Sequence, residues 1–147
     1  MKPPRVVLAD DHTMIRDALK SVIEREFEVV GTFADGVSLV EGAPALNPNI
    51  ILLDISMPNM NGLNAGRRLK QLMPAVKLIY LTMNQDPDIA AEASRLGASA
   101  YLLKTSEGPE LLQAIRQVAR GGSYVTPLLT KDMVGSFVQN FKRRKPN

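Results

Sequence analysis

The segment ILLDISMPNMNG, residues 51–62, joins an apolar run to a loop rich in proline, asparagine and glycine. Together with Ile50, the run is apolar at every position, which is typical of a strand buried on both faces of a parallel sheet. It stops at Asp54, and the proline, asparagine and glycine residues beyond it favour a loop. The segment therefore predicts a buried strand over 50–53 that brings the Asp54 carboxylate to one edge of a sheet.

The same unit, a short apolar strand followed by a helical period, repeats on both sides of this segment. Further strands are predicted at 6–9, 29–33, 77–81 and 100–103. Apolar residues at helical spacing follow, over 14–23, to about 46, to about 73, over 89–96 and over 111–119. Gly97 and the pair Gly121-Gly122 close two of these helices. Five β/α repeats predict the α/β class, with a flavodoxin-like, doubly wound sheet of five parallel strands.

The amino-acid composition excludes several kinds of functional site. The 147 residues hold no cysteine and one histidine, which excludes disulfides, cysteine zinc sites and multi-histidine metal sites. No apolar run approaches the roughly 20 residues that span a bilayer, so a soluble cytoplasmic protein is expected. Four of the 18 Lys+Arg residues form the run 142–145, and without them the count is 14 against 15 acidic residues. The basic charge therefore belongs to the tail, and DNA binding by the body of the chain is not indicated.

Polar residues stand where four of the predicted strands end. Asp10-Asp11 follows the first strand, Asp54 the third, Thr82 the fourth and Lys104 the fifth. In a doubly wound sheet the ligand site lies beyond the carboxyl ends of the strands. Three carboxylates, a hydroxyl and an ammonium are therefore expected at one edge, although they come from four separate segments.

This combination restricts the possible chemistry. Crowded carboxylates stay ionised only if a cation offsets their repulsion. Oxygen ligands suit a hard ion, above all Mg²⁺, which keeps several waters and favours one or two carboxylates plus phosphate oxygens. A carboxylate can also attack phosphorus to give an aspartyl phosphate, whose charge Mg²⁺, Lys104 and Thr82 would neutralise.

Each of these residues also has an ordinary structural interpretation when it is taken singly. An aspartate that closes a strand is commonly a turn or a helix cap, and a lysine there is commonly solvated. Asp11 or His12 could cap the first helix, and His12 is interpreted as a helix start rather than as an acid or base. The joint placement at four strand ends favours the functional interpretation.

The chain resembles the response-regulator receiver family over about residues 4–122. The matching segments are VLADD (7–11), ILLDISMPNMNG (51–62), LT (81–82) and AYLLK (100–104), and the second is highly specific. The resemblance implies that a sensor histidine kinase phosphorylates Asp54. One departure is Thr105, where many receivers have a proline after a cis bond.

The resemblance also implies roles for the other residues. Asp10 and Asp11 would hold Mg²⁺, helped by the Asp54 carboxylate and the backbone carbonyl of Ser56. Thr82 and Tyr101 would rearrange on phosphorylation, and Lys104 would pair with the phosphoryl group. The family is a signalling family, so the chain is not expected to be an enzyme.

The segments LLQAI (111–115) and ARGGSY (119–124) resemble the NarL/FixJ group, whose members carry a LuxR-type helix-turn-helix domain. The expected division is a receiver over 1–122 and a linker over 123–147. DNA binding would then belong to an output domain outside this chain, and a homodimer is expected on phosphorylation. A receiver-plus-linker fragment and a stand-alone receiver both remain open.

Within the linker, a helix is predicted over about 127–141. Thr126 is a candidate N-cap, Pro127 suits a first turn, and an apolar stripe follows at Leu129, Met133, Phe137 and Phe141. So short a helix needs covering, which predicts a buried Phe137. The stripe could pack on this receiver, on a second chain or on an output domain. The basic run after it is interpreted as a solvated hinge.

Three other functions share parts of this pattern. A haloacid-dehalogenase phosphatase uses an aspartyl nucleophile but needs a second aspartate two residues later, where Ser56 stands. A receiver fold used only for binding usually lacks one of the acidic or lysine positions. An FMN carrier would need a Ser/Thr/Gly-rich phosphate loop after the first strand.

Overall fold

The computed structural model describes residues 3–83, 86–106 and 108–126. Its elements alternate in chain order, and they are β1 (Arg5–Ala9), α1 (Thr13–Ile23), β2 (Glu28–Phe33), α2 (Gly36–Leu46), β3 (Ile50–Asp54), α3 (Gly62–Leu72), β4 (Lys77–Thr82), α4 (Pro87–Arg95), β5 (Ala100–Leu103), α5 (Gly108–Ala119) and β6 (Tyr124–Val125). The five predicted β/α repeats are confirmed. The helix predicted over 127–141, with Phe137, lies outside the described residues.

All strands of the sheet are parallel, in the order β2-β1-β3-β4-β5-β6. The strand order reverses at β1, so the crevice between β1 and β3 is the switch point at which ligands bind in such sheets. The sheet has six strands rather than the predicted five. Backbone amides of Tyr124 and Thr126 donate to the carbonyls of Ser99 and Tyr101, each at 3.1 Å, and so attach β6 to β5. Two residues are too short a run to show an apolar alternation.

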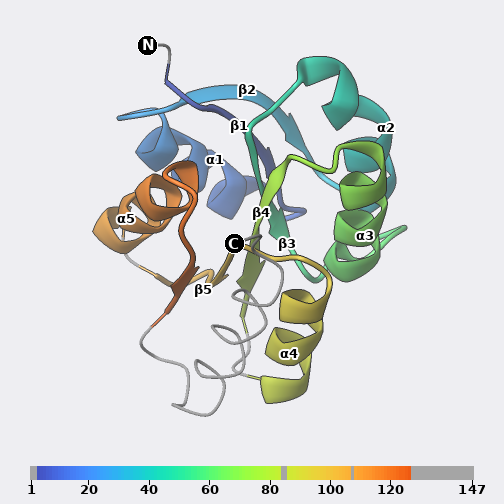
Figure 1. Cartoon of the computed structure of the whole chain (residues 1–147). Coiled ribbons are helices and arrows are strands. Elements are labelled where there is room, and N and C mark those ends of the chain that lie inside the picture. The colour runs from blue at the N-terminus through green and yellow to red at the C-terminus, as the bar shows by residue number, and fades with distance from the viewer. Residues whose placement is uncertain (1–2, 84–85, 107, 127–147) are drawn as a thin grey trace.

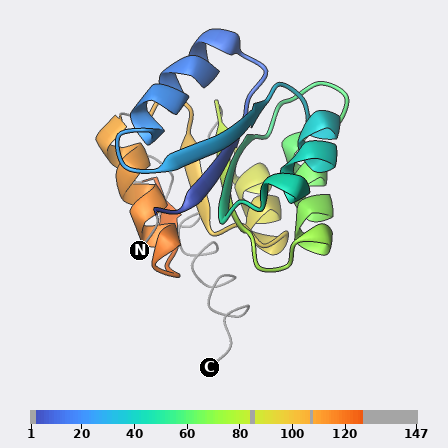
Figure 2. The ribbon, with the colours of Figure 1, turned by 90° about the horizontal axis from the view of Figure 1, so that it is seen from above.

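Helices cover both faces of the sheet. Figure 1 and Figure 2 show α1 and α5 together on one face and α2, α3 and α4 on the other. Alternate strand residues serve the two layers, because successive side chains point to opposite faces. In β3, Ile50 and Leu52 pack toward α1 and α5, whereas Ile51 and Leu53 pack toward α2, α3 and α4. The predicted burial of this strand on both faces is confirmed, and all four side chains are at most 1% exposed.

Local signals start and stop the helices. The Asp35 carboxylate accepts from the Ser38 amide at 2.8 Å to cap α2, and the Asn61 side chain accepts from Asn64 at 2.9 Å to cap α3. Gly97 and Gly121 have positive φ angles, 100° and 88°, where the sequence predicts helix ends. No helix within the described ranges is both long and apolar enough to cross a membrane.

Candidate functional site

Polar side chains from different strands meet at the carboxyl edge of the sheet. Asp10 follows β1, Asp54 closes β3, Thr82 closes β4 and Lys104 follows β5. All four residues are buried, with exposed fractions of 0%, 2%, 4% and 7%. Burial of charged groups is costly unless they are paired, so this edge is built around its ion pairs.

Lys104 is the centre of this pairing. Its Nζ lies 2.8 Å from Asp54 Oδ2 and 3.0 Å from Asp10 Oδ2. The side chains are at most 2% exposed, so water screens these contacts poorly. Although burial alone would lower the pKa of the ammonium, hydrogen bonds with Asp54 and Asp10 raise it above its usual value. Lys104 is therefore a fixed positive charge between two carboxylates.

The loop after β3 holds the Asp54 carboxylate in place. The Ser56 amide donates to Asp54 Oδ1 at 3.0 Å, and the Gly62 amide donates to the Ile55 carbonyl at 2.7 Å. A Cβ at Gly62 would lie 2.2 Å from the Asp54 carbonyl oxygen, so only glycine lets α3 start this close to the strand. Burial raises the pKa of the Asp54 carboxyl, and the bonds from Lys104 and Ser56 oppose that rise.

The second acidic residue, Asp11, lies at the more open side of this group, with its side chain 34% exposed. One oxygen each of Asp10, Asp11 and Asp54, together with a ring nitrogen of His12, lie within 4.8 Å of one another. Three carboxylates here face one lysine. The group thus has an excess of negative charge and could hold a cation.

Asp10 supplies a further sign that a cation fits. Its Oδ2 is fully buried and is close to the Lys104 ammonium, yet it accepts no hydrogen bond of acceptable geometry. The ion pair with Lys104 compensates its charge, and the oxygen can still accept a contact from a metal ion or its water. The donors are mostly carboxylate oxygens, as hard divalent ions require.

Thr82 and Tyr101, the two residues expected to rearrange, pack inside the fold between the site and α4. Tyr101 is fully buried and lies in the same core as Ala90 and Ala93 of α4. Burial raises the pKa of its hydroxyl to about 12, and the Thr82 side chain partly offsets this. The Lys104 amide donates to the Thr82 carbonyl at 2.7 Å, which ties the ends of β4 and β5 together.

Two residues were not assigned to the site from sequence. His12 begins α1 as expected, but its side chain makes no capping bond and its Nδ1 instead lies 3.0 Å from Lys104 Nζ. Arg16, one turn later, donates to the Asp10 carbonyl at 2.8 Å. The signal available was the i, i+4 spacing of two basic side chains directly after the acidic pair.

The peptide bond between Lys104 and Thr105 is trans, since none in the described ranges is cis. The cis bond common in receivers at this point is therefore not present in this chain.

Comparison with known proteins agrees with this geometry. The family model described as response regulator receiver domain matches residues 6–116. The chain is 38% identical over 135 residues to the transcriptional regulatory protein DegU of Brevibacillus brevis, covering 90% of this chain and 57% of that protein. It is 34% identical to the oxygen regulatory protein NreC of Staphylococcus carnosus, covering 92% of this chain and 64% of that protein. A LuxR-family two-component response regulator from Aurantimonas sp. superposes with a TM-score of 0.83, at 29% identity, over 98% of this chain and all of that one.

The chain belongs to the response regulator receiver family, and the predicted grouping with LuxR-type regulators is confirmed. It spans between half and two thirds of the length of the DegU and NreC relatives.

Proposed function

We propose that this receiver takes a phosphoryl group onto Asp54 from a sensor histidine kinase, with Mg²⁺ bound beside it, and thereby controls a transcriptional output domain. The observation that carries the proposal is the Asp54 carboxylate. It lies at the switch point of the sheet, 2% exposed, with Lys104 on one oxygen and the Ser56 amide on the other.

Asp54 is the nucleophile in this proposal. One of its oxygens forms the P–O bond as the P–N bond of the donor histidine breaks. Lys104 and the Ser56 amide hold the carboxylate in one orientation, and that reduces the entropy cost of reaching the reactive geometry. After transfer, the Lys104 ammonium and the Thr82 hydroxyl neutralise charge on the phosphoryl oxygens.

Mg²⁺ would be held by Asp10, Asp11, the Asp54 carboxylate and the backbone carbonyl of Ser56. When bound, it neutralises charge on the donor and the transferred phosphoryl group. The excess of carboxylates over lysine and the close grouping of their oxygens support this ligand set.

The signal would leave the site through β4 and β5. Thr82 is drawn toward the new phosphoryl group, and its interaction with the buried Tyr101 couples that shift to the core beneath α4. Lys104 would exchange part of its contact with Asp54 and Asp10 for the phosphoryl oxygens. The expected readouts are homodimer formation and DNA binding through an output domain outside this chain, in the cytoplasm.

Phosphorylation is tested by incubating the chain with Mg²⁺ and acetyl phosphate, then measuring its intact mass. One acid-labile phosphoryl group is expected on the wild type and none on Asp54→Asn, because an amide is a poor nucleophile. Asp17→Asn, an exposed aspartate on α1, is the matched control and should label fully. Full labelling of Asp54→Asn would refute the assignment.

A phosphatase activity is the second function to compare. An aspartyl phosphatase needs an acid two residues after its nucleophile, and Ser56 stands there. No turnover of a generic phosphomonoester is therefore expected, and steady turnover that Asp54→Asn abolishes would favour the phosphatase instead.

A further inference from the structure

His12 is the residue of the acidic cluster that the proposed chemistry leaves without a role. Its Nδ1 lies 3.3 Å from both Asp10 Oδ1 and Asp11 Oδ1, and 3.0 Å from Lys104 Nζ. The side chain is still 57% exposed, so the ring forms the solvent side of the cluster. It is also the single histidine of the chain.

The ring is oriented by contacts inside the cluster and not by the helix that it begins. His12 is the N-cap residue of α1, yet its side chain makes no capping hydrogen bond. Its backbone amide donates to Asp10 Oδ1 at 2.8 Å, which fixes the residue against the acidic pair.

The neighbours of Nδ1 can be served by two forms of the ring. With the proton on Nδ1, the ring donates toward the Asp10 and Asp11 carboxylates; with the proton on Nε2, Nδ1 accepts from Lys104. An ammonium has only donors, so the 3.0 Å contact with Lys104 is a hydrogen bond when Nδ1 accepts and Nε2 carries the proton. In that tautomer the Nδ1 lone pair points into the cluster. Metal coordination uses this same lone pair, so an ion bound at Nδ1 would replace its contact with the Lys104 ammonium.

The spacing around Nδ1 suits one coordination sphere. Adjacent ligands of an octahedral ion with bonds of about 2.1 Å are about 3 Å apart. The two distances of 3.3 Å from Nδ1 to the carboxylate oxygens are close to that edge. The ring and the Asp10-Asp11 pair can therefore share one ion.

We propose that His12 Nδ1 is a ligand of the metal site, so that the site prefers later first-row transition ions such as Co²⁺ over Mg²⁺ more strongly than carboxylates alone would. The inference rests on the metal site of the proposed function. Imidazole nitrogen favours transition ions, whereas Mg²⁺ favours oxygen. His12 thus determines which divalent ion occupies the receiver when several compete.

The first test measures Co²⁺ and Mg²⁺ affinity by calorimetry on the tag-free chain and on His12→Asn. Asparagine is a good N-cap residue and carries a hard oxygen, so α1 and Mg²⁺ binding should persist. Co²⁺ affinity is expected to fall about tenfold while Mg²⁺ affinity changes less than about twofold, by analogy with the loss of a metal-site contact. Met14→Ala, the 86% exposed neighbour, is the control and should keep the wild-type ratio. Equal losses for both ions, or no loss for either, would overturn the proposal.

The second test detects the metal–nitrogen bond itself. Electron spin echo modulation of the Mn²⁺-loaded chain should show coupling to an imidazole ¹⁴N, and His12→Asn should lack it. Because the chain has one histidine, that signal has one possible source. A Mn²⁺-loaded wild type without ¹⁴N coupling refutes the role of His12. If Mg²⁺ still supports labelling of Asp54 in that case, the proposed function stands; if neither ion binds, the metal site itself is wrong.

Discussion

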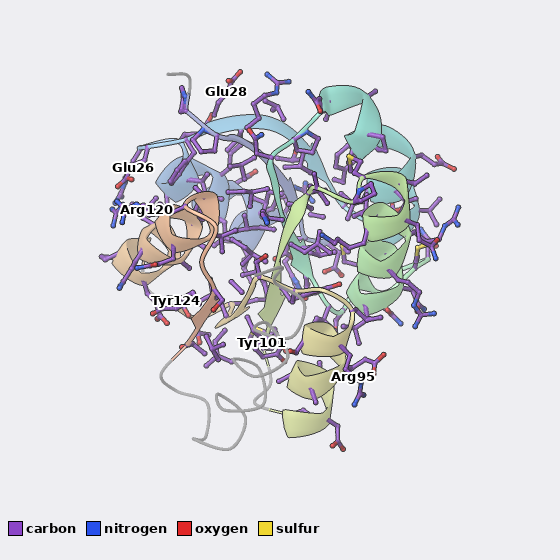
Figure 3. The ribbon with its side chains drawn as sticks, viewed as in Figure 1. Glu26, Glu28, Arg95, Tyr101, Arg120 and Tyr124 are labelled. Carbon is purple, nitrogen blue, oxygen red and sulfur yellow. The ribbon has the colours of Figure 1, made fainter. Side chains whose placement is uncertain are left out.

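Two ion-pair clusters lie at opposite ends of this receiver. At the carboxyl edge of the sheet, Lys104 holds Asp10 and Asp54 with side chains at most 2% exposed. On the other side, Arg116 of α5 forms a bidentate pair with Glu26 after α1, and these side chains are 42% and 34% exposed. Figure 3 labels Glu26 on the α1 and α5 side of the molecule, well away from Tyr101.

The two clusters differ in their net charge and in their exposure to solvent. The Arg116–Glu26 pair is neutral and partly hydrated, so it fixes geometry at little energetic gain or cost. The carboxyl-edge cluster buries two carboxylates on one ammonium, with Asp11 nearby, and desolvation makes that imbalance costly. The buried cluster thus has more negative than positive charge. A metal ion can neutralise that excess, and a phosphoryl switch can make use of it.

The largest effect is expected from Lys104→Ala. Removal of one partner from a buried pair leaves Asp10 and Asp54 uncompensated, at a cost of about 3–5 kcal/mol at pH 8 without metal. The loss in the free energy of unfolding should become smaller as the pH falls and the carboxylates take up protons. Mg²⁺ should restore part of the lost stability. Urea unfolding at several pH values, with and without Mg²⁺, measures both effects.

Lys77→Ala, an exposed lysine at the other end of β4, is the control and should cost little. A loss at Lys104 that is below about 1 kcal/mol and independent of pH would remove the contrast between the two clusters.

Lys104→Ala should also still be phosphorylated at Asp54, but Thr82 and Tyr101 should no longer respond to beryllofluoride in NMR spectra.

Asp54→Asn should act in the opposite direction and stabilise the metal-free chain near neutral pH, because burial holds the pKa of the folded Asp54 carboxyl above its unfolded value. The folded pKa of Asp54 is raised, chiefly by burial, so wild-type stability falls as pH rises from the unfolded value, 3.8, through the folded one. The gain in the variant should grow over that window and level off above it. A variant that unfolds more readily than the wild type at pH 7.5 without metal would contradict this.

Asp11→Ala should weaken Mg²⁺ binding about tenfold or more, with little effect on the metal-free fold. The Asp11 side chain is partly exposed, and the N-cap position of α1 is occupied by His12. Because one repelling carboxylate is removed, the melting temperature without metal should stay level or rise slightly. A clear drop in that temperature would indicate that Asp11 serves the helix rather than the ion.

The smallest effect is expected at the exposed pair. The bidentate bond to Arg116 lowers the pKa of Glu26, so its contribution to stability is present above the unfolded value of 4.5 and disappears as pH falls through the folded value. Glu26→Gln should therefore melt slightly below the wild type at pH 6 and level with it at pH 3. An equal difference at both pH values would show that the pair acts through packing and not through charge.

Most of the fold could be predicted from the sequence because the signals for strands and helix ends are local. Apolar runs such as 50–53 and the glycines at 97 and 121 act within a few residues, so strands and helix ends follow from composition and spacing. The parallel order then follows from the alternation of strands and helices. Strand β6 was not predicted because two residues are too few to show a hydrophobic alternation. Only its backbone pairing with β5 defines it.

For the site, the sequence by itself determined which chemical groups reach the carboxyl edge, because each stands where a strand ends. Only the tertiary structure decided how they share their charges. Lys104 is bound to Asp10 and His12 across 94 and 92 residues of chain, and no local pattern reports such contacts. The sequence predicts His12 only as the start of a helix. Its contacts with Asp10 and Asp11 are local in the chain, but its contact with Lys104 exists only because the sheet brings Lys104 close to the end of β1. The physical reason is that propensity acts through neighbours in the chain, whereas electrostatic pairing acts through neighbours in space.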